Sequence, residues 1–318
     1  MDKLLKQLIP PVSVSGREQA VRDVIAKLAK PLGDVSTDHL GNLVVHKPGS
    51  GKRIMLAAHM DSVGLIVTYV EKEGFARVAP IGGLRPALIL GQRVRFENGA
   101  AGVICCDRDV KIEDLSFDTL YIDAFGQTVE VGMTAVFWSD PVFAGSKVMS
   151  SFLDNRLGCA VCLQALAQMG PTDNEIFCVF TAQEEVGIRG AKPAAYAITP
   201  DLAIAVDICG IADTPGKTHP NALTLEGGPV VKIMDARVIC HETVIGLLEQ
   251  TASDLGISTQ RYVTKRGGTD AGAIFNTRGG VPSGVLSIPI RYTHSPNEIA
   301  DLNTAADCAR LLAAAITR

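Results

Sequence analysis

Long apolar runs and clusters of basic residues are both missing from this sequence. No apolar stretch is long and uncharged enough to span a bilayer. The charged N-terminus soon meets Pro10-Pro11, so it lacks the apolar core of a signal peptide. Lysine and arginine are scattered and the net charge is −4, which argues against nucleic-acid binding. We therefore expect no membrane partner and no nucleic-acid partner.

Aromatic residues and paired cysteine motifs are also scarce. Aromatics make up only 5% of the chain, which leaves little material for the stacking platforms of a carbohydrate enzyme. The eight cysteines include one C-x-x-C, Cys159 to Cys162, with no second pair at zinc-finger spacing. Most of the others lie in apolar stretches, as buried reduced thiols do. These features predict a cytoplasmic protein whose C-x-x-C packs inside a helix.

Apolar residues are plentiful, and their pattern indicates an α/β fold. The chain has 318 residues, 47% of them hydrophobic, which is enough for more than one domain. A capping-box pattern at Ser15 to Glu18 predicts a helix that ends near Lys30. After residue 150, helices and strands alternate, as in a sheet covered by helices. The predicted strands are 42–46, 53–58, 176–181, 202–206 and 285–290, and the later helices are 154–169, 242–255 and 304–318.

Residues 63–150 have a different sequence pattern, with short strand-forming runs separated by glycine and proline. The predicted strands there are 65–70, 75–78, 93–96, 102–106 and 134–138. The sequence therefore predicts a mixed-sheet α/β domain, made of residues 1–62 and 151–318, that is interrupted by a small all-β, barrel-like domain.

Polar residues end several of the predicted strands. Ligands of open α/β sheets bind beyond the carboxyl ends of the strands, so these residues are candidates for chemistry. They are His59 with Asp61, Glu184 with Glu185, Asp207 and His294. Asp154, at the start of a helix, joins them, although an N-cap is the simpler interpretation of that residue alone. Each of the others, taken singly, is also more often structural than functional.

Together, these residues are more informative. Two histidines and at least three carboxylates form a mixed nitrogen and oxygen set that suits a pair of borderline divalent ions, zinc being the first choice. Glu184 and Glu185 are consecutive and diverge, so they do not form the facing carboxylates of a glycoside hydrolase.

Eight segments, in order along nearly the whole chain, resemble the tetrahedral (TET-type) glutamyl/leucyl aminopeptidases. These are dinuclear metallo-exopeptidases, once mislabelled endoglucanases. The matching segments are residues 38–43, 58–64, 81–83, 152–158, 184–191, 206–207, 267–271 and 291–296. The resemblance implies a zinc-exopeptidase-like catalytic domain and an aminopeptidase that acts on peptides.

The resemblance also implies roles for individual residues. His59 and Asp207 would hold one metal, Glu185 and His294 the other, and Asp154 would bridge the two ions. Glu184 would be the general base for a water activated by both metals, and Asp61 would be the partner of His59. Zinc is expected, with cobalt or manganese as alternatives. The loop of Gly268, Thr269 and Asp270 would contact the substrate, together with Arg291 and Tyr292.

The family's β insert is a dimerisation domain, and its dimers assemble into a tetrahedral dodecamer. Here residues 121–132 are shorter than the family pattern, and this departure concerns the assembly and not the metal residues. Two other functions stay open at this point. One is a related dinuclear amidase or deacylase, and the other is a non-catalytic assembly relative.

Overall fold

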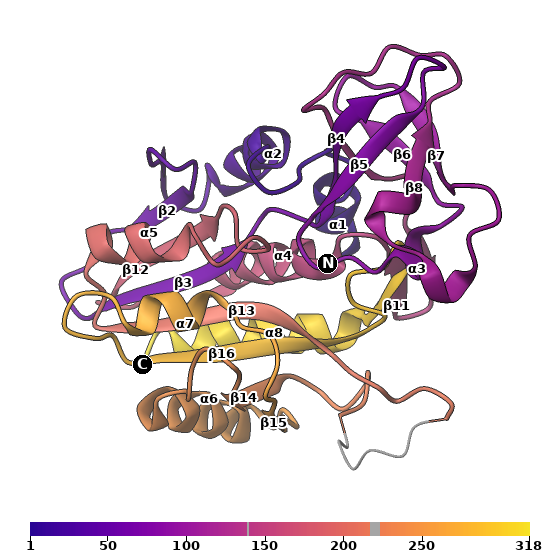
Figure 1. Ribbon diagram of the computed structural model, residues 1–318. Helices are drawn as coiled ribbons and strands as arrows, with labels where there is room; N and C mark the ends of the chain where they lie inside the picture. The colour runs from indigo at the N-terminus through magenta and orange to yellow at the C-terminus, as the bar shows by residue number, and fades with distance from the viewer. Residues whose placement is uncertain (139, 217–222) are drawn as a thin grey trace.

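A computed structural model describes residues 1–138, 140–216 and 223–318. Its largest feature is a mixed sheet with helices on both faces, and a closed β-barrel stands apart from one end of that sheet (Figure 1). The predicted α/β class with an inserted barrel-like unit is confirmed. In the described parts of the chain, no helix is long and apolar enough to cross a membrane.

The large sheet has the strand order β1-β2-β12-β3-β13-β16-β17-β11-β10, with β14 on β16 and β15 on β14. Its central strands β12, β3, β13 and β16 are parallel, so their carboxyl ends meet at one edge. The strands are β1 Asp34–Thr37, β2 Leu43–Lys47, β3 Arg53–His59, β10 Val142–Ala144, β11 Lys147–Ser150, β12 Glu175–Thr181, β13 Leu202–Gly210, β14 Val230–Met234, β15 Gln260–Val263, β16 Ser283–Arg291 and β17 Glu298–Asp301.

Helices cover both faces because the central strands are apolar on both sides. Along β3, Leu56 and Ala58 pack into a core with α1, α2, α4, α6 and α8, whereas Met55 and Ala57 pack toward α5 and α7. The helices are α1 Asp2–Leu8, α2 Gln19–Ala29, α4 Leu153–Gln168, α5 Ala191–Ile198, α6 Glu242–Leu255, α7 Asp270–Phe275 and α8 Leu302–Ala315. Cys159 and Cys162 of α4 are fully buried in this core.

The barrel closes in the order β4-β5-β8-β7-β6-β9, around a core that includes Leu65, Phe96 and Ile104. Its elements are β4 Gly64–Val70, β5 Ala76–Ile81, α3 Pro86–Ile89, β6 Arg93–Phe96, β7 Ala101–Cys106, β8 Leu120–Asp123 and β9 Thr134–Phe137. The sequence did not predict β8, which two short 3-10 turns precede at Ile112–Asp114 and Phe117–Thr119. The next strands, β10 and β11, pair within the large sheet instead.

Two local predictions were wrong. Ser15 does not cap the helix: its hydroxyl donates to Asp61, and α2 begins only at Gln19, where Glu18 occupies the N-cap. Asp207 does not end its strand, because β13 stays paired with β16 as far as Gly210. Both differences arise from contacts with segments far away in the sequence.

Candidate functional site

The candidate residues meet at the carboxyl edge of the parallel strands. His59 is the last residue of β3, Glu184 and Glu185 follow β12, and Asp207 lies in β13. His294 follows β16, and Asp154 lies at the start of α4, where the backbone is not yet helical. The N-cap interpretation of Asp154 was wrong, because the backbone of Asp154 and Asn155 is not helical and the side chain of Asn155, not that of Asp154, accepts from a backbone N–H of the helix, that of Gly158. The fold thus gathers six side chains from five segments at one place.

Asp154 connects two groups of possible metal ligands. One group is His59, Asp154 and Asp207, and the other is Asp154, Glu185 and His294; within each group the ligand atoms lie within 4.8 Å of one another. His59 Nε2 is 3.1 Å from Asp154 Oδ1, whereas His294 Nε2 is 3.3 Å from Asp154 Oδ2. The two carboxylate oxygens of Asp154 therefore face different groups.

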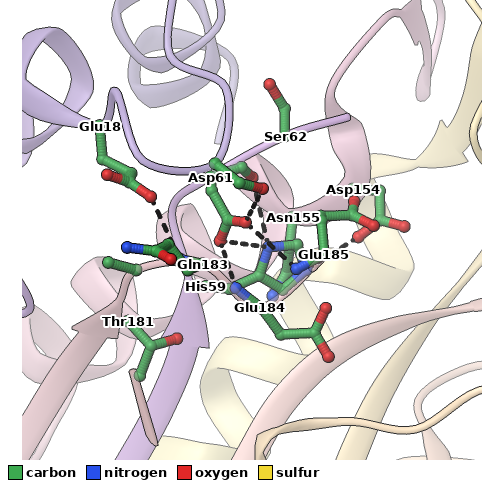
Figure 2. Close-up of polar contacts among 12 residues, drawn as sticks. Glu18, His59, Asp61, Ser62, Asp154, Asn155, Thr181, Gln183, Glu184 and Glu185 are labelled. Atoms are coloured by element: carbon green, nitrogen blue, oxygen red, sulfur yellow. Dashed lines mark hydrogen bonds and ion pairs between the residues drawn. The ribbon is translucent and has the colours of Figure 1, made fainter. Parts of the chain in front are cut away.

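Asp61 is completely buried and holds the turn that carries Glu184 and Glu185. Its Oδ1 accepts from the backbone N–H of Glu184 at 3.0 Å, and its Oδ2 accepts from that of Glu185 at 3.1 Å. Figure 2 shows the Asp61 carboxylate facing this turn. His59 Nδ1 lies 3.2 Å from the backbone carbonyl of Asp61 and 3.5 Å from its Oδ1. Asp61 thus contacts both His59 and the two glutamates.

Glu184 belongs to neither ligand group, and its side chain points away from Asp61 (Figure 2). It lines a cavity of about 560 Å³ that His59, Asp154, Glu185, Asp207 and His294 also line. Burial raises the pKa of Glu184 well above its ordinary value. The geometry leaves this carboxylate available to a molecule in the cavity.

Negative charge is crowded at this edge of the sheet. Burial raises the pKa of Glu185 to about 8, and the charge of Asp154 adds to the rise. Burial opposes the charged form of His294, but hydrogen bonding to Asp154 and the charge of Glu185 raise its pKa to about 10. Carboxylates outnumber the histidines, so the cluster favours cations.

Glu298 is a site residue that the sequence did not predict. It is buried in β17; its Oε2 accepts from the backbone N–H of Asp154 at 3.0 Å, and its Oε1 accepts from that of His294 at 2.9 Å. Glu298 thereby ties together two residues that come from distant parts of the chain. Its position four residues after His294 was the only signal, since a carboxylate that binds backbone has no distinctive spacing.

We expect Glu298→Gln to weaken metal binding about 10- to 100-fold, as losses of partners behind metal ligands do. The amide offers one acceptor where the carboxylate offers two, so one N–H would lose its partner. Metal content after dialysis measures the effect. Asp235→Asn is the matched control, because Asp235 is another buried carboxylate that accepts two backbone N–H groups. An unchanged metal content in Glu298→Gln would contradict this role.

Of the five residues predicted to contact substrate, Gly268 lines the cavity. Thr269 and Asp270 are buried, and Asp270 accepts from the Thr181 hydroxyl at 2.6 Å. Arg291 forms a two-bond pair with Asp213, at 2.7 and 2.8 Å. Tyr292 is half exposed and lines a separate cavity beside Leu88 and Met149. The last four are thus not among the residues that line the central cavity.

Comparison with known proteins gives consistent matches over the whole chain. The family model for M42 glutamyl aminopeptidases matches residues 41–311. A putative aminopeptidase of Acetivibrio thermocellus is 43% identical, and the match covers 99% of this chain and 98% of that protein.

Solved structures of aminopeptidases are also similar to this chain. An aminopeptidase of the archaeon Desulfurococcus kamchatkensis superposes with a TM-score of 0.95 at 36% identity, covering 99% of this chain and 94% of the other. The TET1 peptidase of Pyrococcus horikoshii, described as assembling into a tetrahedron or a large octahedral shell, gives 0.89 at 29% identity, covering 99% and 98%.

Proposed function

The chain belongs to the M42 glutamyl aminopeptidase family and is a metal-dependent aminopeptidase, and we propose that it works with two metal ions that share Asp154. The observation that carries the proposal is the pair of ligand groups meeting at this residue, with one carboxylate oxygen directed to each group.

The residues present fit such ions. Glu185 Oε1 is buried and has no hydrogen-bond partner among the described residues, as expected of an atom that binds a cation. Each group combines one imidazole with carboxylates, a set that suits zinc first and also cobalt or manganese. His59 and Asp207 would hold one ion, and Glu185 and His294 the other. When bound, such ions polarise a carbonyl oxygen and lower the pKa of water.

Glu184 would serve as the general base. Its carboxylate faces the cavity, outside both ligand groups, so it can take the proton of the attacking water and pass it to the leaving amine. Asp61 would position this base by holding the backbone N–H of Glu184 and Glu185. The crowded carboxylates would also attract the charged α-amino group of an unblocked peptide, which favours removal of N-terminal residues.

A free amino group is the requirement that separates this function from that of a related amidase or deacylase. We expect hydrolysis of leucyl-p-nitroanilide and none of its N-acetyl derivative, and loss of the activity after chelation. Release of nitroaniline with and without a chelator measures both. A preference for the acylated substrate would replace the aminopeptidase with a deacylase.

We further propose that the barrel within residues 63–150, strands β4 to β9, is a self-association domain and that the chain forms a dodecamer built from dimers. The support is the assembly described for the P. horikoshii relative and the exposure of Ile112, Phe125 and Val131 on this part of the chain. Light scattering should give a particle of twelve chains; a monomer would contradict the proposal.

We also propose a cytoplasmic, reducing location. All eight cysteines are free thiols, and six of them are buried. Protein thiols stay reduced in that compartment.

A further inference from the structure

The turn that carries Glu184 and Glu185 is held by side chains from three distant segments. The backbone N–H groups of residues 182 to 185 follow one another, and each of them donates to a side-chain oxygen. Asp61 accepts from the last two of these N–H groups. The first two donate to Asn42 and Glu18, which come from the segments before β2 and α2.

Glu18 binds the residue that precedes Glu184. It is 5% exposed, and its Oε1 accepts from the backbone N–H of Gln183 at 3.1 Å and from that of Gly16 at 2.7 Å. Figure 2 shows the Glu18 carboxylate directed at Gln183. Glu18 occupies the N-cap of α2, but its side chain makes no capping hydrogen bond. The carboxylate of Glu18 therefore binds the turn instead of the helix.

Asn42 joins the two ends of the segment that begins at this turn, residues 182–190. The residue is fully buried; its Oδ1 accepts from the backbone N–H of Ala182 at 2.8 Å, and its Nδ2 donates to the carbonyl of Gly190 at 2.9 Å. The N–H of Gly190 donates to the carbonyl of Ala182 at 3.0 Å. A Cβ placed on Gly190 would lie 2.3 Å from Asn42 Oδ1, so a glycine is needed beside this amide.

The turn needs such support because its backbone is strained. Gln183 has a φ of 57°, in the left-handed region that residues other than glycine rarely adopt. Such a conformation persists only where the surrounding contacts hold it. Directly after this reversal, Glu185 joins the second ligand group, whereas Glu184 faces the cavity. The hydrogen bonds to the turn thus fix the point at which the two glutamates diverge.

Arg156 supplies a positive charge near the two carboxylates that hold the turn. It is fully buried, and its Nη2 donates to the carbonyl of Ser13 at 3.3 Å. Burial lowers the pKa of Arg156 to about 10, and the charges of Asp61 and Glu18 are among those that oppose this shift. Because the interaction is mutual, the guanidinium favours the charged forms of both acids. Charged acceptors form the stronger hydrogen bonds to backbone N–H groups.

We propose that Glu18 and Asn42 are positioning residues for the general base, and that they set the backbone of residues 182–185 so that Glu184 meets the attacking water. The inference rests on the proposed function, which makes Glu184 the base. Neither Glu18 nor Asn42 is among the residues that line the central cavity. Both therefore act through the turn and not by touching the substrate.

Glu18→Ala tests this role in hydrolysis of leucyl-p-nitroanilide at saturating metal. We expect kcat to fall about 10- to 100-fold while KM changes less than about twofold, because a small displacement of a reacting group has effects of this size. Glu18→Gln should keep most of kcat, since its amide oxygen can still accept from both N–H groups. A wild-type kcat in Glu18→Ala overturns the proposal, and so does a Glu18→Gln enzyme as slow as Glu18→Ala.

Asp301→Ala is the matched control for lost stability. Asp301 is 2% exposed, and its Oδ1 accepts from the backbone N–H of Thr304 at 2.9 Å, at the start of α8 and outside the lining of the central cavity. We expect this variant to melt at a lower temperature, as Glu18→Ala does, but to keep its kcat per metal-loaded chain. A parallel fall of kcat in both variants would mean that lost stability accounts for the effect, and would overturn the proposal.

Hydrogen exchange separates failure of this inference from failure of the proposed function. Mass spectrometry of a peptide covering residues 180–190 measures the protection of the four amides in metal-loaded protein, without turnover. We expect slow exchange in the wild type and exchange at least about tenfold faster in Glu18→Ala, because the opening of a local segment sets this rate. The peptide around Thr304 should change only in Asp301→Ala.

Faster exchange confined to residues 180–190 in Glu18→Ala supports the role of Glu18 in holding the turn even if the wild-type enzyme hydrolysed no anilide. Fast exchange of these amides in the wild-type protein overturns the proposal without the use of a variant. Hydrolysis of leucyl-p-nitroanilide would then still uphold the aminopeptidase.

Discussion

Glu184→Gln is expected to lower kcat about 10²- to 10⁴-fold while the metal content stays at its wild-type level, which is the range for loss of a general base. The amide has the same shape but cannot take a proton. Glu184 lies outside both ligand groups, so its replacement removes no proposed metal ligand. Steady-state kinetics and elemental analysis of the same sample measure the two quantities.

Glu185→Gln is the matched comparison, because it makes the same carboxylate-to-amide change at the neighbouring residue. We expect Glu185→Gln to lose metal, because Glu185 belongs to the second ligand group. A Glu184→Gln enzyme with near wild-type kcat would show that another residue moves the proton.

Asp154→Asn is expected to lower the occupancy of both metals and to reduce activity to the level of chelated enzyme. Asp154 is the one residue common to the two ligand groups, and its two oxygens face different histidines. An amide presents one oxygen and one NH₂ group to the same neighbours, so one ion would lose an anionic ligand and the other would face a donor. Metal analysis after dialysis measures the loss.

Asp207→Asn provides the comparison within the same site. Asp207 belongs only to the group with His59, so its variant should lose one ion before the other. If Asp154→Asn and Asp207→Asn lost the same amount of metal, the shared role of Asp154 would be contradicted.

The site residues could be predicted because the sequence marks strand ends. Apolar runs such as 54–58 and 176–181 end in His59 and in Glu184 with Glu185, and parallel strands bring such ends to one edge. Asp154 could be predicted as a site residue only in combination with these residues, because a single Asp at the start of a helix is usually an N-cap. The alternation of helices and strands gave the α/β class for the same local reasons.

The features of the site and the fold that were not predicted depend mostly on contacts between distant segments. Glu298 accepts from the backbone N–H of Asp154 and of His294, and its position four residues after His294 was too weak a signal to predict these contacts. Arg291 pairs with Asp213 from another loop, a contact that no local pattern indicates. The strand β14 was not predicted because Lys232 interrupts its apolar run. Lys232 lines the central cavity, which accounts for a lysine in this strand.

Metal titration of the chelated enzyme tests the central claim, that two ions share Asp154, most directly. Cobalt would be added in steps to metal-free protein while hydrolysis of leucyl-p-nitroanilide and bound metal are followed together. We expect activity to reach its maximum only as two equivalents per chain become bound, and we expect the Asp154→Asn enzyme to regain neither the second ion nor the activity. Full activity with one equivalent, or in the metal-free protein, would contradict it.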